Sequence, residues 1–385
     1  MNTTRLLSTA LLLLAAPPAA RADTIKVPQD HSTIQAAIDA SLDGDVIEIK
    51  GGKYEESITI ANKTNVQIIG KGKVTLLPPG LGPGFSMSGC TGCTVEKIRL
   101  SGAAGSGFEL TGCTGGSLLD CRAEDVLGDG IRLDDCDGVT IDGCFVKFSG
   151  LAGVALATGT DTPTDNCTVS GCKILDSFGD GVSVNGSGNT ITGNTITKTL
   201  GLAIQIDATT PGAGNHLTGN KIKKVDDEAI LVTGSDTEVA DNSVSLGNSE
   251  GIVVLAGTGH SVTGNKVNKV VGNGVLIGLL APGATVSDNT ISNVLDDGID
   301  ARGDDAVCED NTIKGPAESG FEITGDAGTY TGNLVKGAKG DGFLIFSGDN
   351  VLTFNTAKGS KGFDLNDLGI GNSIDDTNNF KKVAP

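Results

Sequence analysis

One phrase recurs along most of the chain and limits the folds that the sequence can adopt. The phrase runs Gly, apolar, any residue, apolar, a turn, apolar, two residues, Asn, any residue, apolar. Gly181–Val184 with Asn194 is one copy, and Gly251–Val254 with Asn265 is another. The asparagines of this column are 22 to 26 residues apart and stand at Asn194, Asn220, Asn242, Asn265, Asn289, Asn311, Asn333 and Asn355. A near-constant period of this length is typical of a solenoid in which each copy is one structural unit.

The alternation inside each phrase predicts short β-strands. Apolar residues two positions apart give each strand one buried face, and Gly and Asn at fixed offsets mark the turns. Three such strands per copy, stacked about 4.8 Å apart, describe an all-β fold, a right-handed parallel β-helix of about twelve rungs. One predicted core column runs from Phe108 to Phe363, and its partner runs from Leu110 to Leu365. A leucine-rich repeat would need more leucine and a helix in each copy.

A short helix is expected before the repeats, at residues 32–41. Ser32 and Gln35 fit a capping box, and Ile34, Ala37 and Ile38 share one face. This helix would cover the open end of the solenoid, where free strand edges invite aggregation. We therefore expect one domain at 23–385, with the cap at 32–41 and regular rungs at 85–366. The asparagine column should be structural, with amides bonded along the stack.

Residues 1–22 are expected to be a secretory signal. Arg5 precedes an apolar run that is too short to span a bilayer, and Ala20-Arg21-Ala22 is an A-x-A cleavage site. The protein should therefore be extracellular or periplasmic, and no later stretch approaches a membrane span. The formal net charge of -19 disfavours nucleic acid. It also disfavours polyanionic glycans, unless a divalent cation bridges.

The segments Thr33–Asp39, Gly44–Ile47 and Gly52–Glu56 resemble the opening of pectin-lyase-like β-helix proteins, a group that includes pectinesterases and NosD-type repeat proteins. The resemblance covers nearly all of the chain after residue 22. It implies the fold and a carbohydrate-associated role, since this architecture hosts lyases, hydrolases, esterases, epimerases and non-enzymes. Family motifs that would choose among these activities are missing: the polygalacturonase Gly-His-Gly, for example, is replaced by Gly259-His260-Ser261.

Eight of the nine cysteines lie between Cys90 and Cys172. Cys90, Cys113 and Cys136 should stack, and so should Cys121, Cys144 and Cys172, which take the place of asparagine in the early rungs. One-rung separation suits a disulfide, but a column of buried reduced thiols is an equal alternative. Cys308 stands at a core position and is predicted to be a buried free thiol.

Chemistry is expected on the outer face of the first strand of each rung, because in the resembled enzymes this face carries the cleft. A first polar patch comprises Glu109, Arg132, Asp134, Asn185, Gln205 and Asp207. Asp134 and Asp207 could serve acid/base hydrolysis, with turns near 157–166 and 208–215 as groove walls. Alternatively, Arg132 with a bound Ca²⁺ could support β-elimination of a uronic acid. The remaining alternative is a solvated strand face with an ordinary Arg–Asp pair.

Further candidate residues lie along the same face. A second patch of expected substrate-binding residues contains Asp300, Arg302 and Glu322. A column of acids before the strand glycines, with Asp129 and Asp180 as candidate Ca²⁺ ligands, is alternatively ordinary turn chemistry. Between the two patches lies an apolar stretch that could contact a protein partner, made of Leu231, Val253, Leu255 and Leu276.

These features favour a secreted protein that binds or cleaves a polysaccharide along the first-strand face. If it is an enzyme, it should be a polysaccharide lyase or a glycoside hydrolase. Its partner would be a polysaccharide or another cell-surface component. The alternative is a non-catalytic extracellular or cell-surface scaffold that uses the apolar stretch for contact.

Overall fold

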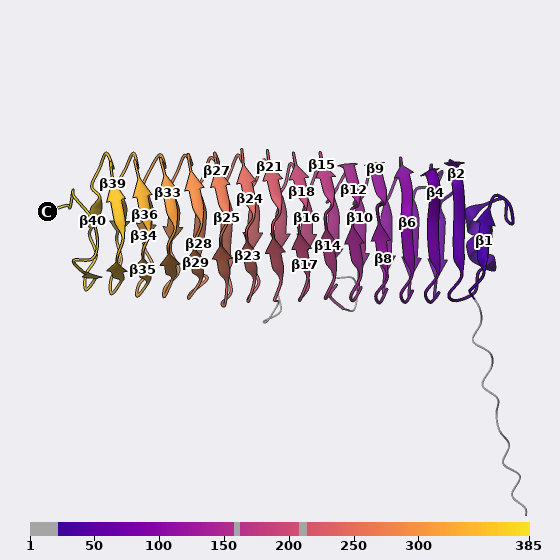
Figure 1. Cartoon of the computed structure of the whole chain (residues 1–385), viewed down its shortest axis with the longest axis horizontal. Helices are drawn as coiled ribbons and strands as arrows, with labels where there is room; N and C mark the ends of the chain where they lie inside the picture. The colour runs from indigo at the N-terminus through magenta and orange to yellow at the C-terminus, as the bar shows by residue number, and fades with distance from the viewer. Residues whose placement is uncertain (1–21, 158–161, 208–213) are drawn as a thin grey trace, which may run out of the picture.

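Each copy of the repeated phrase forms one turn of a right-handed parallel β-helix (Figure 1). The computed structural model describes residues 22–157, 162–207 and 214–385. Its described part contains about fifteen turns in one continuous stack, rather than the twelve that the sequence predicts. The additional turns come mainly from the N-terminal region. The strands there are long, and the sequence lacks the Gly and Asn phrase on which the predicted number of rungs depends.

The first strands of the turns form a 14-stranded parallel sheet. These strands are β3 (Ile58–Ala61), β5 (Phe85–Ser88), β7 (Phe108–Thr111), β10 (Ile131–Asp134), β13 (Val154–Ala157), β16 (Val182–Val184), β19 (Ile204–Ile206), β22 (Ile230–Val232), β25 (Ile252–Ala256), β28 (Val275–Leu280), β31 (Ile299–Ala301), β34 (Phe321–Ile323), β37 (Phe343–Ile345) and β40 (Leu365–Asp367).

The other strands form a 27-stranded parallel sheet that supplies the remaining faces. The long N-terminal strands are β1 (Thr24–Val27), β2 (Val46–Tyr54), β4 (Gln67–Leu76) and β6 (Thr94–Ser101). Second strands are β8 (Ser117–Leu119), β11 (Thr140–Asp142), β14 (Thr168–Ser170), β17 (Thr190–Thr192), β20 (His216–Thr218), β23 (Glu238–Ala240), β26 (Ser261–Thr263), β29 (Thr285–Ser287), β32 (Val307–Glu309), β35 (Thr329–Thr331), β38 (Val351–Thr353) and β41 (Ser373–Ile374). Third strands are β9 (Arg122–Val126), β12 (Phe145–Ser149), β15 (Lys173–Leu175), β18 (Thr195–Thr197), β21 (Lys221–Lys223), β24 (Ser243–Ser245), β27 (Lys266–Asn268), β30 (Thr290–Ser292), β33 (Thr312–Lys314), β36 (Leu334–Lys336) and β39 (Thr356–Lys358).

Two predicted core columns are confirmed over most of their length, but the last turn was misaligned. Phe343 pairs with Leu365 and not with Phe363. The error is a shift of two residues, which leaves the inward and outward alternation unchanged, so the pattern cannot detect it. Upstream, the columns extend to Phe85 and Ile58. Within the stack, the rings of Phe321 and Phe343 lie 4.8 Å apart and nearly parallel.

The asparagine column forms a buried ladder, as the sequence predicts. Asn265 accepts a hydrogen bond at Oδ1 from the backbone N–H of Asn242 at 2.9 Å, and its Nδ2 donates to the carbonyl of Val239 at 2.7 Å. Each amide thus ties its own turn to its two neighbours. A second ladder at another corner, which the sequence analysis missed, contains Asn189 and Asn215.

The nine cysteines are free and buried, so the reduced ladder is the alternative that the structure adopts. Cys144 donates its thiol to the carbonyl of Leu118 at 3.5 Å, and Cys172 donates to that of Ile141 at 3.7 Å. These thiols contact carbonyls of the preceding turn, as the asparagine amides do further along. The prediction of a buried free thiol at Cys308 is confirmed.

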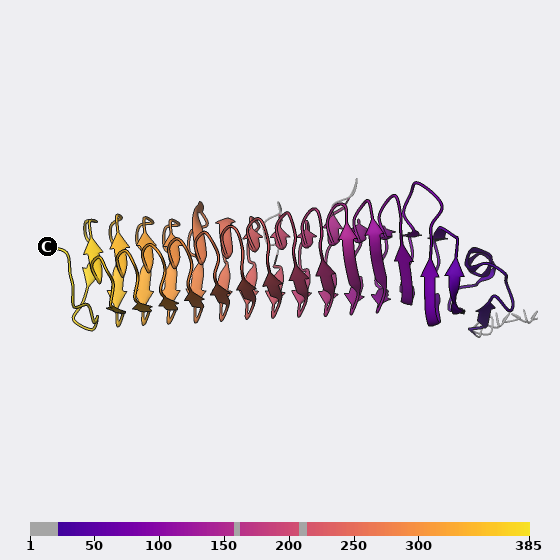
Figure 2. The ribbon, with the colours of Figure 1, turned by 90° about the horizontal axis from the view of Figure 1, so that it is seen from above.

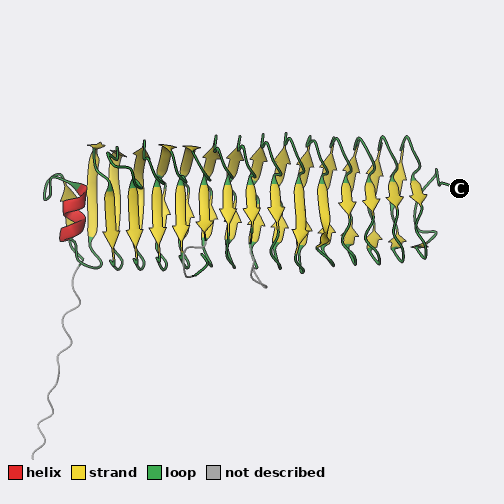
Figure 3. Cartoon of the chain, turned by 180° about the vertical axis from the view of Figure 1, so that it is seen from behind, coloured by secondary structure: helices red, strands yellow, loops and turns green. Residues whose placement is uncertain are grey.

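The predicted cap is present as helix α1 (Ile34–Ala40), which lies over the N-terminal end of the stack (Figure 3). Its N-cap is Thr33, whose hydroxyl accepts the N–H of Ala36, so the predicted capping box beginning at Ser32 is wrong. The Glu56 carboxylate also caps the helix, because it accepts hydrogen bonds from the first two helical N–H groups, both at 3.0 Å. Figure 2 shows the stack from above, with the C-terminus at the end opposite to the helix. At that end the Phe380 ring packs on Phe343, with the ring centroids 5.3 Å apart.

The expected signal at residues 1–22 lies outside the described residues, except for Ala22. Within the described ranges, the structure contains no helix of the length and apolar character that crossing a membrane requires.

Candidate functional site

The outer face of the 14-stranded sheet carries the predicted polar residues in register. Arg132 lies directly beside Glu109 on one neighbouring strand and beside Ala155 on the other. Asp300 lies beside Glu322 in the same manner. Side chains at these positions alternate with the two core columns, so the pleat of each strand turns them away from the core. The face therefore presents two separate polar patches, as expected.

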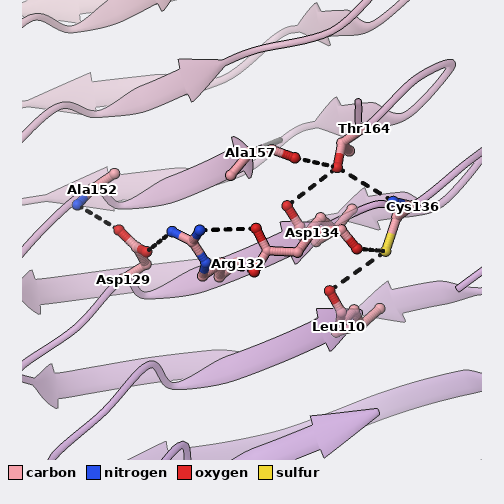
Figure 4. Close-up of polar contacts among 9 residues, drawn as sticks. Leu110, Asp129, Arg132, Asp134, Cys136, Ala152, Ala157 and Thr164 are labelled. Atoms are coloured by element: carbon pink, nitrogen blue, oxygen red, sulfur yellow. Dashed lines mark hydrogen bonds and ion pairs between the residues drawn. The ribbon is translucent and has the colours of Figure 1, made fainter. Parts of the chain in front are cut away.

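In the first patch, Arg132 is held between two carboxylates (Figure 4). Its Nε and Nη2 donate to Asp134 at 2.7 and 2.8 Å, and its Nη1 donates to Asp129 at 3.1 Å. The hydrogen bonds that Arg132 donates to Asp134 are the largest influence on its pKa, which they raise. The hydrogen bond to Asp129 raises the pKa of Arg132 further. A guanidinium held by two carboxylates has few donors left for a substrate carboxylate. These contacts join strand β10 to the corner that precedes it in the same turn.

The other predicted catalytic residue, Asp207, is not brought close to Asp134. The strands β13 and β16 lie between their two strands. Three strand spacings correspond to about 14 Å, which exceeds the roughly 6.5–9.5 Å between the carboxyl groups of an inverting glycosidase. Asp207 instead accepts a hydrogen bond from the Thr233 hydroxyl at 3.2 Å. The expected groove walls fall largely on 158–161 and 208–213, outside the described residues.

Of two predicted substrate-binding residues, Asn185 follows β16 on an intervening turn, and Gln205 lies on β19, the turn of Asp207. Gln205 is directly beside Ser183 on one neighbouring strand and beside Leu231 on the other. The face around them is thus uncharged between Asp134 and Asp207.

The candidate Ca²⁺ ligands Asp129 and Asp180 do not share a site. The turn that carries Ala152 separates them, and Asp129 accepts the N–H of Ala152 at 2.9 Å. Asp180 accepts the N–H of Leu202 at 2.9 Å, and burial raises its pKa. Both carboxylates thus bond to the backbone of the next turn. Among the described residues, no group of three or more His, Cys, Asp and Glu side chains has the geometry of a metal site.

The second patch is a more unusual electrostatic arrangement. Asp300 is only 2% exposed, and its Oδ2 accepts hydrogen bonds from Nε and Nη2 of Arg302 at 2.8 and 2.5 Å. Its Oδ1 is buried without a hydrogen-bond partner. A buried carboxylate oxygen without a donor is costly, because a charged group loses its hydration there. The exposed Arg302 side chain pairs only with the other oxygen of this carboxylate.

Asp297 adds a further buried carboxyl group to this patch. It is 5% exposed, and its Oδ1 accepts the N–H of Ser319 at 2.6 Å. Burial raises its pKa to about 7, and the charges of Glu322 and Asp300 act in the same direction. The pKa of Glu322 is also raised by burial and then by Asp300, while Arg302 and a hydrogen bond with Asp297 lower it. We name Asp297, Asp300, Arg302 and Glu322 the carboxyl cluster.

At neutral pH, the carboxyl cluster holds a proton that can be given up or regained. Two carboxyl groups whose environments differ, one neutral near pH 7 and the other ionised, are the usual requirement for acid/base catalysis. Perturbed pKa values at a polar surface patch identify it as a candidate functional site.

The comparisons with known proteins agree with the fold. The family model described as "Right handed beta helix region" matches in overlapping segments, at residues 56–196, 162–280, 211–358 and 276–380. The chain belongs to this right-handed β-helix family. No curated protein sequence matches it.

Solved β-helix structures resemble the chain in shape at low sequence identity. The Azotobacter vinelandii mannuronan C-5 epimerase AlgE6 A-module is 17% identical with a TM-score of 0.64, over 78% of this chain and 93% of that one. The receptor-binding domain of the Siphovirus 9NA tailspike is 12% identical with a TM-score of 0.59, over 94% and 76%. Tailspike protein 3 of bacteriophage CBA120 is 15% identical with a TM-score of 0.58, over 93% and 59%.

Asp297 stands in the column of acids before the strand glycines, to which Asp129 and Asp180 also belong. The sequence signal for a site at this position is that its own turn and the next contribute further acids, at Asp300 and Glu322. In the apolar stretch, Val253 is buried, and Leu255 is 45% exposed. Leu231 and Leu276 are half-buried. His260 is buried, and its Nδ1 has no hydrogen-bond partner among the described residues.

Proposed function

We propose that this β-helix protein is a secreted polysaccharide hydrolase, with the carboxyl cluster as its acid/base centre. The observation that carries the proposal is the buried Asp297 carboxyl group: burial, followed by the charges of Glu322, Asp296 and Asp300, raises its pKa to about 7. The mannuronan epimerase that shares the fold has a polysaccharide substrate by its name. The signal predicted at residues 1–22 would deliver the chain to such substrates outside the cell.

The roles follow from accessibility and charge. Glu322, the most accessible of the three carboxyl groups, would contact the glycosidic oxygen. Asp297 and Glu322 would share one proton near neutral pH, and Asp297 would be the group that holds it. Asp300, which pairs with Arg302, would stabilise the positive charge that develops on the sugar ring.

The spacing of the strands also suits hydrolysis. Asp300 and Glu322 are on directly adjacent strands. A strand spacing of about 4.8 Å is close to the roughly 5–5.5 Å between carboxyl groups in retaining glycosidases. The calcium-assisted lyase alternative would first require Arg132 to leave its two carboxylate partners, which makes it a less suitable use of this face.

The test is depolymerisation of a polysaccharide panel by the protein without residues 1–22, with and without Ca²⁺. Product size would report cleavage, and absorbance of unsaturated products would separate a lyase from a hydrolase. We expect cleavage without unsaturated products, and a loss of roughly 10²-fold or more in rate for Glu322→Gln. The matched control is Asp305→Asn, which removes an equal charge from an exposed residue on the neighbouring turn and keeps a side chain that tolerates its positive φ of 56°.

Each outcome decides between the candidate functions. Cleavage by Glu322→Gln at the rate of the unchanged protein would remove the carboxyl cluster from the mechanism. Unsaturated products that require Ca²⁺ would favour the lyase. No cleavage across the panel would contradict the enzymatic proposal and favour the non-catalytic scaffold.

A further inference from the structure

The third strands of the turns carry an unusual concentration of positive charge. These strands lie side by side along the solenoid, from β9 to β39 (Figure 1). We name their outward side chains, with the turn residue after each strand and the matching end of β2 and β6, the third-strand face. Half of the 28 lysine and arginine residues of the chain lie on it. They are Lys53, Arg99, Arg122, Lys147, Lys173, Lys198, Lys221, Lys223, Lys224, Lys266, Lys269, Lys314, Lys336 and Lys358.

Acidic residues are scarce at the same positions. Glu124, Asp125 and Asp176 occupy them, all toward the N-terminal half. Glu124 neutralises Arg99 at 2.6 Å and also contacts Arg122 at 3.5 Å, and Asp176 lies 3.4 Å from Lys198. From β21 onward, by contrast, none of the lysines on this face makes an ion pair with a described residue. The formal net charge of -19 for the whole chain therefore conceals a positive face.

The register fixes the spacing of these charges. Lys173, Lys221 and Lys266 stand in one column, with a hydroxyl residue between each pair. Alternate turns are about 9.6 Å apart. Unpaired like charges held along a rigid surface raise its potential and attract a polyanion. The energetic benefit is greatest for an extended ligand that runs along the stack.

Hydroxyl side chains alternate with the lysines and favour a sugar chain over other polyanions. The outward residues of β18, β24 and β30 are Thr or Ser: Thr195, Thr197, Ser243, Ser245, Thr290 and Ser292. Hydroxyl groups both donate and accept, as the hydroxyls of a saccharide do. Phosphate backbones offer acceptors alone, so they would use only part of this surface.

A groove beside the same face supplies an apolar contact for a sugar ring. Its volume is about 440 Å³, and its lining includes Phe148, Phe178 and Leu200, with Lys198 and Lys224. Phe178 is 63% exposed and Phe148 is 41% exposed, although only 3% of residues are aromatic. Exposed apolar groups gathered in one groove commonly mark a binding site. Asp176 and Asp226 also line the groove, and Asp176 pairs with Lys198. The ring faces therefore suit the C–H groups of a pyranose, and Lys224, which makes no ion pair with a described residue, suits a carboxylate.

We propose that the third-strand face binds an acidic polysaccharide of the uronate class, with the Phe148–Phe178 groove as one sugar subsite. The negative net charge of the chain predicts that such a polymer is disfavoured. The positive face removes that objection without a bridging cation. The proposal goes beyond the proposed function because it concerns another face of the solenoid. It stands whether or not the carboxyl cluster is catalytic.

The first test is binding of polygalacturonate by affinity electrophoresis and calorimetry, at low and at physiological salt, with uncharged dextran as the comparison. We expect salt-sensitive binding of polygalacturonate and none of dextran. Lys221→Gln with Lys266→Gln should weaken binding roughly tenfold, on ordinary values for exposed ion pairs. The matched control, Lys26→Gln with Lys381→Gln, removes the same charge outside the face and should change affinity less than twofold.

A second variant pair tests the groove. Phe178→Ala should weaken polygalacturonate binding roughly fivefold, while Phe354→Ala should not, although Phe354 is 64% exposed and thus matched in exposure. Equal losses in the face and control variants, or no binding at low salt, would overturn the proposal. Duplex DNA bound as tightly as polygalacturonate would overturn the glycan assignment. This test measures binding and the hydrolase test measures cleavage, so the failure of one can be told apart from the failure of the other.

Discussion

Replacing Asp297 with asparagine should change how the stability of the protein depends on pH. The folded chain raises the pKa of this carboxyl group to about 7 through burial. The unfolded chain has an ordinary value of about 3.9. Between these values, the folded state binds a proton that the unfolded state does not, so this residue makes the protein less stable as the pH rises. An asparagine cannot ionise and should remove that dependence.

The size of the effect follows from the two pKa values. Proton linkage predicts that Asp297 lowers the free energy of unfolding by about 3 kcal/mol between pH 5 and pH 8. The substitution should fit, because Asn273 in the same column accepts the N–H of Asp297 at 3.1 Å through its amide oxygen. The Ser319 N–H would keep an acceptor in the same way. Relative to the unchanged protein, Asp297→Asn should therefore gain about 3 kcal/mol of stability over this pH interval.

Urea unfolding at pH 5, 6, 7 and 8 measures this difference directly. Far-ultraviolet circular dichroism and tyrosine fluorescence should give one coincident transition, which a comparison of free energies requires. Asp305→Asn, at an exposed position, controls for the loss of one negative charge and should follow the unchanged protein. If the curves for Asp297→Asn and the unchanged protein are parallel in pH, the raised pKa is refuted. The acid/base role of the carboxyl cluster would then lose its support.

Two further predictions concern the ladders inside the solenoid. Asn265→Ala should lower the free energy of unfolding by about 3 kcal/mol, because the buried N–H of Asn242 and the carbonyl of Val239 lose their side-chain partner; the exposed Asn248→Ala should change it by about 0.5 kcal/mol or less, and similar losses for both would contradict the ladder's role. A thiol reagent should label none of the nine cysteines in the folded protein and all nine in urea without reductant. Fewer than nine labelled thiols in urea would indicate disulfides, and the burial of all nine side chains explains the expected lack of reaction in the folded state.

The repeating phrase predicts the fold well because the same physical constraint acts in every turn. A residue at an inward position must be apolar, and a corner needs Gly or Asn, so errors in one copy are corrected by the others. This redundancy is absent at the ends. The turns around β2 and β4 lack the phrase, and the Gly362-Phe363-Asp364-Leu365 segment imitates it two residues out of register. The number of turns and the last alignment were therefore the parts that the sequence could not determine.

The candidate site was only partly predictable for a different reason. Alternation identifies Asp300, Arg302 and Glu322 as outward residues. It does not predict that Arg302 pairs with a buried Asp300. It also does not predict that Asp297, in the corner before that strand, belongs to the same cluster. These facts depend on side-chain burial, and burial changes a carboxyl pKa far more than sequence neighbours do. Likewise, Arg132 and Asp134 look like catalytic partners in the sequence, but their bidentate contact at 2.7 and 2.8 Å leaves them bound to each other.

Net charge describes a solenoid incompletely, because a solenoid distributes its residues among separate faces. Each outward column samples one residue from every copy, so a bias at one position of the phrase is repeated along the stack. Lysine after the ladder asparagine recurs at Lys221 and Lys266, and two residues later at Lys223. A bias of this kind gathers positive charge on one face even when the corners and the other faces make the total strongly negative. The charge of each column is therefore the quantity from which the binding of a polyanion should be argued, and the polygalacturonate experiment tests that argument.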